Sequence, residues 1–204
     1  MIEQMEMLRL LEKHRGDAVV MPVFRTAAPW AQVTRNPKRD VPIGTYDFPF
    51  AMSKASSFAL GFCLAQPSVK VILFDGDGSL LMNLGSLVTV AKKGPKNLCH
   101  FVMDNGVYAT TGGQEIPGRG ASSYAALAKA AGYAQAYEFD DLEEFALRID
   151  EILNQDGPIL VCIKTVPDIR GPEERFSGDR LTLQVPKPVT DLLEQFGAKQ
   201  RQDR

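Results

Sequence analysis

The sequence predicts an α/β fold of three layers, α/β/α, in which helices cover both faces of a mainly parallel sheet. Short apolar segments of strand length alternate with segments of helical spacing, which is the order of a parallel sheet with helical crossovers. Residues 69–75 form a continuous apolar run with β-branched residues, typical of a central strand buried on both faces. Hydrophobic residues make up 45% and charged residues 24% of the chain, which excludes disordered and collagen-like classes.

The length predicts a single domain. The 204 residues suit one domain over 1–204, with its core at about 17–165 and a C-terminal tail at 166–204. The chain carries 23 Lys and Arg against 25 Asp and Glu, for a formal net charge of −2. Because there is no basic excess, we expect no nucleic-acid partner.

Cysteine usage and hydropathy predict a cytoplasmic protein without a membrane span. Three cysteines lie in apolar runs without metal-ligand spacing, and an odd number of buried thiols is typical of a reducing compartment. No apolar stretch reaches the roughly 18 residues that a membrane helix needs. Residues 1–4 mix charged and apolar side chains and show no signal-peptide core.

The first third of the chain predicts two helices and one strand. Apolar residues recur at near-helical spacing from residue 2 to a stop near 16, which indicates an amphipathic helix. The Val-rich segment 18–24 is a strand candidate. Residues 25–47 contain three prolines, a glycine and several charges and are expected to be mostly loop. Residues 55–65 follow as a buried helix.

The rest of the chain repeats the alternation of strand and helix. Residues 69–75 and 97–103 are predicted strands, and residues 81–93 between them return to helical spacing. The remaining expected elements are helices at 123–131 and 142–153, strands at 134–139 and 158–164, and a short helix at 189–196.

The turn at residues 76–79, Gly-Asp-Gly-Ser, joins a predicted buried strand to a helix. Glycines let the backbone approach a ligand closely, and free N–H groups at a helix start attract phosphate. A carboxylate at Asp77 would repel bare phosphate, so the turn indicates a divalent cation between them, such as Mg²⁺ with oxygen ligands. The alternative is a tight turn in which Asp77 only caps the helix.

A phosphatase offers a rival interpretation of the same turn. Residues 75–80 resemble the nucleophile motif of haloacid-dehalogenase-type phosphatases, with Asp75 as nucleophile and Asp77 as acid and base. That motif normally lies near the N-terminus, whereas 74 residues precede it in this chain. The later Lys and the paired acidic loop of that family have no convincing match.

A second polar turn follows the strand at 97–103. Twenty-six residues, 79–104, separate Gly78 from Asn105. If the two strands are parallel neighbours, Asp77 and Asn105 emerge at the same edge of the sheet, where ligands bind in such folds. Their side-chain oxygens can then hold one octahedral cation facing a diphosphate.

This arrangement resembles the thiamine diphosphate-dependent enzymes, whose cofactor motif is Gly-Asp-Gly followed about two dozen residues later by Asn. The resemblance covers roughly residues 41–165 and is most specific in 76–87 and 97–114, which look like the cofactor-binding half of phosphonopyruvate and sulfopyruvate decarboxylases, in particular a beta-type subunit. It implies that Mg²⁺ is bound by the side chains of Asp77 and Asn105 and by the carbonyl of Val107.

The resemblance also implies the residues that contact the cofactor. Gly76, Gly78 and Ser79 are expected to contact the diphosphate. Thr110 follows residues 105–107 and is expected to line the pocket. Upstream, residues 50–57 align with the family's Gly-Ser-Met-Gly-x-Ala-Ser-Ser. Met52 then matches the apolar residue that supports the bent cofactor, and the carbonyl of Phe50 accepts from the pyrimidine amino group. Both flanking glycines of the family pattern are replaced, by Phe50 and Ser53.

The resemblance implies that half of the active site lies on another chain. The glutamate that activates the cofactor belongs to a pyrimidine-binding domain, for which this chain has no second strand–helix set. The implied function is therefore the thiamine diphosphate- and Mg²⁺-binding subunit of a 2-oxo acid decarboxylase, acting on a small 2-oxo acid within a hetero-oligomer, a heterotetramer or larger. A thiamine-dependent carboligase, acetolactate synthase-like, is equally compatible with this half of the site.

No catalytic residue is predicted in this chain itself. His14 is expected to be solvated at a helix end, and His100 to be structural within its strand. A sulfonate or phosphonate on the substrate would require cationic groups, and the candidates are Arg25, Arg35, Arg39 and Lys54.

Overall fold

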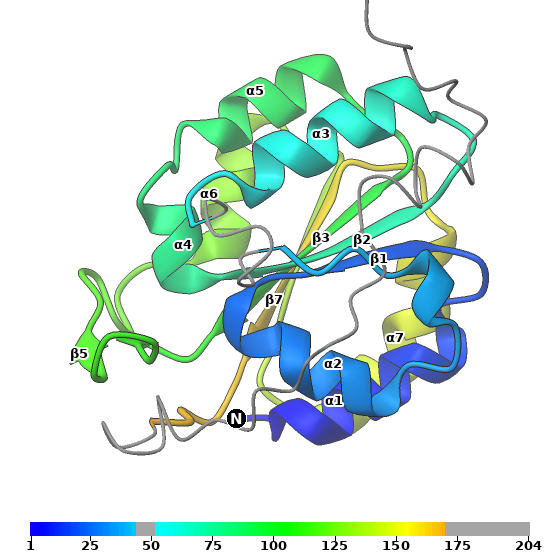
Figure 1. The fold of residues 1–204 in the computed structure, drawn as a ribbon. Coiled ribbons are helices and arrows are strands. Elements are labelled where there is room, and N and C mark those ends of the chain that lie inside the picture. The colour runs from blue at the N-terminus through cyan, green and yellow to red at the C-terminus, as the bar shows by residue number, and fades with distance from the viewer. Residues whose placement is uncertain (44–51, 170–204) are drawn as a thin grey trace, which may run out of the picture.

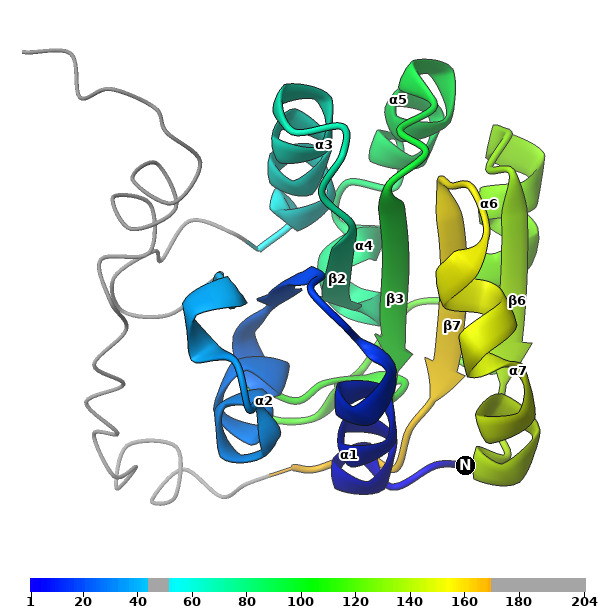
Figure 2. The same ribbon diagram turned by 90° about the vertical axis from the view of Figure 1, so that its right-hand side faces the viewer.

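A computed structural model describes residues 1–43 and 52–169, and its centre is a five-stranded sheet. The strands are parallel throughout and lie in the order β1-β2-β3-β7-β6. Figure 2 shows β3, β7 and β6 side by side and pointing the same way. Their bounds are β1 (Val19–Pro22), β2 (Val71–Gly76), β3 (Leu98–Asp104), β6 (Gln135–Phe139) and β7 (Ile159–Lys164).

Helices cover both faces of this sheet, so the predicted three-layer α/β/α architecture is confirmed (Figure 1). One face carries α3 (Ala55–Ala65), α5 (Ser86–Lys93) and α6 (Tyr124–Ala131). The other carries α1 (Gln4–His14), α2 (Ala27–Val33) and α7 (Leu142–Asn154). Among the described residues, no helix has both the length and the apolar character needed to span a membrane.

Two hydrophobic cores lie on opposite faces of the sheet. On β2, Leu73 packs into the cluster shared with α3 and α5, whereas Phe74 packs with Trp30 and with Phe101 on the other face. Successive strand side chains point to opposite faces, so a strand buried on both sides is apolar at nearly every position. This explains why residues 69–75 were recognisable as a central strand.

The main correction concerns residues 25–47, which were predicted to be mostly loop. Up to residue 43 this segment contains α2 and two short 3-10 helices, η1 (Phe24–Thr26) and η2 (Pro37–Arg39). Pro29 lies in the first turn of α2, where a missing N–H costs no helical hydrogen bond. The buried Trp30 ring packs on Phe74 and lies 5.3 Å from the guanidinium carbon of Arg15. Tertiary packing therefore stabilises a helix that the local sequence does not predict.

The structure differs from the predicted elements in two smaller ways, both next to the ends of strands. The helix predicted at 81–93 is shorter, as α5, and a separate short helix, α4 (Asp77–Leu81), begins directly after β2. A short antiparallel hairpin, β4 (Val107–Tyr108) with β5 (Gln114–Glu115), follows β3 in place of plain loop. The helix expected at 189–196 lies outside the described residues.

Candidate functional site

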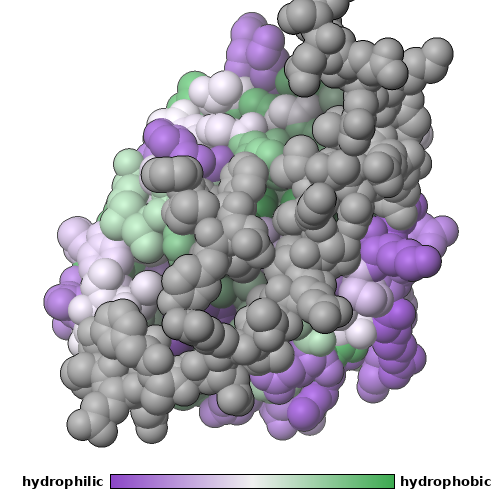
Figure 3. Space-filling model, in the orientation of Figure 1, coloured by the Kyte–Doolittle hydropathy of each residue, from purple (hydrophilic) through white to green (hydrophobic). Residues whose placement is uncertain are grey.

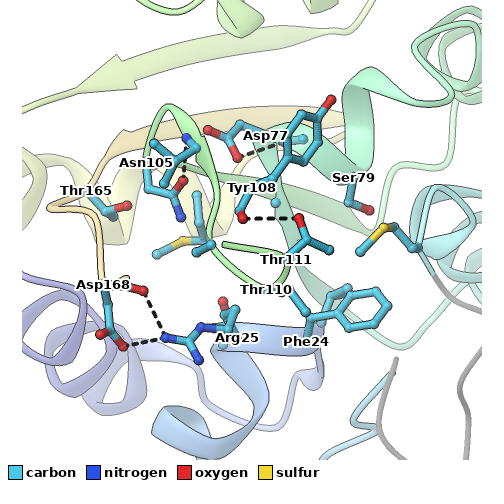
Figure 4. Close-up of a pocket in the computed structure, with 18 of the residues that line it drawn as sticks. Phe24, Arg25, Asp77, Ser79, Asn105, Tyr108, Thr110, Thr111, Thr165 and Asp168 are labelled. Atoms are coloured by element: carbon cyan, nitrogen blue, oxygen red, sulfur yellow. Dashed lines mark hydrogen bonds and ion pairs between the residues drawn. The ribbon is translucent and has the colours of Figure 1, made fainter. Parts of the chain in front are cut away.

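A pocket of about 300 Å³ opens at the carboxyl edge of the sheet (Figure 4). It is formed by the segments that follow β1, β2, β3 and β7, together with Met52 and Gln4. The residues that line it include eight that were predicted to form the site: Met52, Gly76, Asp77, Gly78, Ser79, Asn105, Val107 and Thr110. Phe50, which completes the predicted set, lies outside the described residues.

Asp77 joins the two turns that the sequence singled out. Its Oδ1 accepts a hydrogen bond from the N–H of Gly78 at 2.7 Å, and its Oδ2 accepts one from the N–H of Gly106, also at 2.7 Å. β2 and β3 are adjacent and parallel, with Gly76 opposite Met103. The expectation that both turns meet at one edge of the sheet is therefore confirmed.

The environment of Asp77 is suited to a cation. The residue is only 3% exposed. Burial raises the pKa of its carboxyl to about 7, the N–H bonds from Gly106 and Gly78 lower it, and the nearby carboxyl of Asp104 raises it. A divalent cation beside Asp77 would supply the charge compensation that its ionised form lacks.

Asn105 and Val107 add oxygen atoms beside Asp77. The Oδ1 of Asn105 accepts from the N–H of Val107 at 2.9 Å, and both residues line the pocket. Within residues 1–43 and 52–169, no three or more His, Cys, Asp or Glu side chains are grouped so that they could hold a metal ion. A set of one carboxylate, one amide and one carbonyl is made of hard oxygen donors, and this chemistry fits Mg²⁺ rather than Zn²⁺.

Two glycines are required by the geometry of these turns. A Cβ on Gly78 would lie 2.6 Å from the Tyr108 ring, so the ring packs directly against the backbone. Gly106 has φ +72°, and a Cβ there would meet the Arg119 side chain at 2.8 Å. Tyr108 was not expected in the site, because its contact depends on the hairpin that the sequence did not reveal.

Ser53 keeps a glycine-like backbone despite its side chain. Its φ is +67°, a left-handed conformation that costs a non-glycine residue about 1–2 kcal/mol. Its N–H donates to the Oγ of Ser79 at 3.1 Å, and its carbonyl accepts from the Nδ2 of Asn83 at 2.9 Å. The replacement of glycine by Ser53 therefore changes the side chain here and leaves the turn in a form that glycine also adopts.

Asp75 lies behind the pocket rather than in it. It is 2% exposed, its Oδ1 accepts from the N–H of Gly76 at 2.9 Å, and its Oδ2 is 3.7 Å from the Nε2 of His100. The Nδ1 of His100 is in turn 3.2 Å from the hydroxyl of Tyr133. A phosphatase nucleophile must face its substrate, and Asp75, unlike Asp77, does not line the described pocket, so its position argues against the phosphatase interpretation. His100 is buried within β3, away from the pocket lining.

The side of the pocket opposite Asp77 was largely missed. It is lined by η1 and by the segment after β7, including Phe24, Arg25, Thr165 and Asp168. Arg25 had been named only as one of several possible cationic groups. The segments that form this side are far apart in the sequence, so no local motif marks their meeting.

Comparisons with known proteins identify the family of the chain. Residues 30–163 match the family described as thiamine pyrophosphate enzyme, C-terminal TPP binding domain. The phosphonopyruvate decarboxylase of Streptomyces hygroscopicus is 40% identical over 117 residues, 57% of this chain and 29% of that protein. The sulfopyruvate decarboxylase subunit beta of Methanothermobacter thermautotrophicus is 39% identical over 119 residues, 57% of this chain and 60% of that subunit. The chain thus spans less than two thirds of either relative.

Solved structures share the fold at lower identity. Benzoylformate decarboxylase from Polynucleobacter necessarius superposes with a TM-score of 0.69 at 17% identity, covering 83% of this chain and 34% of that one. A thiamine diphosphate-dependent 4-hydroxybenzoylformate decarboxylase of Rhodococcus jostii gives a TM-score of 0.66 at 20% identity, covering 83% and 33%. The family match covers more than half of the sequence, so the chain belongs to the thiamine pyrophosphate enzymes and contains their C-terminal TPP-binding domain.

Proposed function

We propose that the chain is the thiamine diphosphate- and Mg²⁺-binding subunit of a 2-oxo acid decarboxylase. The observation that carries the proposal is the buried Asp77 carboxylate, which bonds to the N–H of Gly106 and so places Asn105 and Val107 beside it in the pocket. The sequence similarity to phosphonopyruvate and sulfopyruvate decarboxylases supports decarboxylation over carboligation. The position of Asp75, whose carboxyl lies near His100 and outside the described pocket lining, disfavours a phosphatase.

In this proposal the residues divide into three groups along the pocket. Asp77 and Asn105 hold Mg²⁺ through side-chain oxygens, and Val107 holds it through its carbonyl. The diphosphate lies against Gly76, Gly78 and Ser79. The organic part of the cofactor is supported by Met52 and Thr110, with the carbonyl of Phe50 as the acceptor for its amino group.

When bound, thiamine diphosphate supplies the electron sink that loss of CO₂ from a 2-oxo acid requires. The protein orients that cofactor and keeps water from its reacting side. Val23, Met103 and Val107 give the pocket wall an apolar character. The hydroxyl of Tyr124 donates to the Asp77 carbonyl at 3.4 Å and so helps to hold the turn at residues 76–79.

A second chain completes the site in this proposal. It supplies a pyrimidine-binding domain and the activating glutamate, in a cytoplasmic hetero-oligomer of four or more chains. Support comes from the name of the Methanothermobacter relative, a subunit beta. Met82 also lines the pocket while 53% exposed, and hydrophobic residues reach the surface beside α3 and α4, as Figure 3 shows. An apolar surface at a pocket mouth is suited to a protein partner.

Asn105→Ala tests the assignment. It removes one Mg²⁺ ligand, so Mg²⁺-dependent binding of thiamine diphosphate, measured by calorimetry, is expected to weaken by about 10- to 100-fold or more. Asn154→Ala is the matched control, because the Asn154 amide bonds only locally to the Asp150 carbonyl on α7. The native partner is then isolated with the tagged chain, and the pair is assayed for CO₂ release from a panel of 2-oxo acids. Unchanged binding by Asn105→Ala, or a phosphatase activity that the variant retains, would refute the proposal.

A further inference from the structure

The pocket has a cationic side chain, Arg25, on the side opposite the turns at residues 76–79 and 105–107. Arg25 is the one Lys or Arg among the described residues that line the pocket. Figure 4 shows Arg25 and Asp168 across the pocket from Asp77 and Ser79. The turn at residues 76–79 and the Arg25 guanidinium therefore lie on different sides of one cavity.

The backbone before Arg25 is held in an uncommon conformation. Phe24 has φ +45°, a left-handed value for a residue with a side chain, and its N–H donates to the Ile43 carbonyl at 3.0 Å. Strain of this kind persists where the surrounding structure enforces it, and it gathers at binding sites. The turn directs the chain from the end of β1 into η1 and places Arg25 at the pocket wall.

The guanidinium of Arg25 already binds an anionic group. Its Nη2 donates to the Oδ2 of Asp168 at 2.8 Å and to the Asp168 carbonyl at 2.9 Å. The Arg25 side chain is 30% exposed and that of Asp168 is 56% exposed. An ion pair this accessible to water contributes little stability, so another anion can replace the carboxylate at small cost.

The other candidate cations lie elsewhere. Arg35 is 77% exposed and lies 3.6 Å from Glu12, and neither Arg35 nor Arg39 belongs to the described pocket lining. Lys54 precedes α3 and is absent from the described pocket lining. The geometry thus separates Arg25 from the three residues that the sequence alone could not rank against it.

We propose that Arg25 is a specificity-determining residue, which binds a second anionic group at the end of the substrate remote from its reacting carbonyl and exchanges Asp168 for that group. The inference rests on the proposed function. The chemistry required is an oxyanion able to accept from a planar guanidinium, as sulfonates and phosphonates do. Substrates without this group would leave Arg25 paired with Asp168.

The test compares charged and uncharged substrates of similar size. The chain is assembled with its native partner, and kcat/KM is measured for sulfopyruvate, phosphonopyruvate, pyruvate and 2-oxobutyrate. The variants are Arg25→Gln, Arg25→Lys, Asp168→Asn and the control Arg35→Gln, which removes a guanidinium outside the pocket. Thiamine diphosphate binding to each variant is measured separately by calorimetry.

Arg25→Gln is expected to lower kcat/KM for the sulfonate and phosphonate substrates by about 10- to 100-fold relative to pyruvate and 2-oxobutyrate, the range for a lost charged hydrogen bond. Arg25→Lys should retain part of the preference, Asp168→Asn should lower KM for the charged substrates, and Arg35→Gln should leave the ratio unchanged. Equal losses for all four substrates would place Arg25 at their shared carboxylate and overturn the inference, as would no loss.

The two proposals fail in different ways. If the wild-type complex binds no thiamine diphosphate, the proposed function is wrong. If it binds the cofactor and decarboxylates 2-oxo acids, but Arg25→Gln leaves the substrate preference unchanged, only the inference about Arg25 is wrong. Should Arg25→Gln not fold, judged by circular dichroism, the preference of Arg25→Lys and Asp168→Asn decides the outcome.

Discussion

The two ends of the pocket are built in different ways. The Asp77 end (residues 76–79 and 105–107) is held by hydrogen bonds between a buried carboxylate and backbone N–H groups. The Arg25 end (residues 24–26 and 165–168) is held by an ion pair between two partly exposed side chains. One end is fixed by the backbone of two adjacent strands, and the other by a contact that solvent can reach.

This difference accounts for what each end can do. A cofactor site requires ligands that are already in place, because every group that must be ordered on binding reduces affinity. A substrate end has to exchange partners in each turnover, which an exposed pair permits. We therefore expect substitutions at the Asp77 end to affect cofactor binding and those at the Arg25 end to affect substrate choice.

The largest effect is expected from Asp77→Asn. The variant loses the negative charge that would face Mg²⁺ and one of the two oxygens that accept from the N–H groups of Gly78 and Gly106. Thiamine diphosphate binding in Mg²⁺ should weaken by at least about 100-fold, measured by calorimetry. Asp156→Asn, at an exposed residue paired with Lys96, should bind as the wild type does. Similar affinities for both variants would contradict the assignment of Asp77 as a ligand.

Gly106→Ala should have an intermediate effect on stability. At φ +72° an added methyl group strains the backbone, and it would also contact Arg119. We expect the free energy of unfolding in urea to fall by about 1–2 kcal/mol, together with weaker cofactor binding. Gly61→Ala is the control, because Gly61 lies within α3 with open space at its Cβ position, and it should raise stability by about 0.5–1 kcal/mol. A gain in stability for Gly106→Ala would refute the strained turn.

Ser53→Gly should have the smallest effect, with the opposite sign. Glycine adopts φ +67° without strain, so the free energy of unfolding, measured by thermal unfolding, should rise by up to about 1 kcal/mol. Ser57→Gly, at an exposed position in α3, should instead lose roughly 0.5–1 kcal/mol. If both substitutions destabilise the protein equally, the left-handed turn at Ser53 does not exist as described.

Much of the fold could be predicted because burial leaves a simple pattern. β2, β3 and β7 are buried on both faces, so their sequences are apolar at most positions. α2 could not be predicted, since Pro29 and the nearby charges resemble a loop and only the burial of Trp30 against Phe74 favours the helix. Local chemistry determines the strands, whereas distant contacts determine α2.

The same division applies to the site. Asp77 and Asn105 follow adjacent parallel strands, so their positions in sequence indicate their meeting in space. Arg25 and Asp168 are 143 residues apart, and neither belongs to a motif. Tyr108 approaches Gly78 only because the β4–β5 hairpin folds back over α4. The part of the site built on neighbouring strands could be predicted from the sequence, as could Met52 through the family resemblance, whereas the Arg25 end could not.

The central claim is that the turns at 76–79 and 105–107 form one Mg²⁺-dependent cofactor site. The most direct test is calorimetric titration of thiamine diphosphate into the chain with its native partner, once with Mg²⁺ and once with EDTA. We predict saturable binding with Mg²⁺, and its loss in EDTA and in Asp77→Asn. Binding that is equal with Mg²⁺ and EDTA, or no binding in either, would contradict the claim.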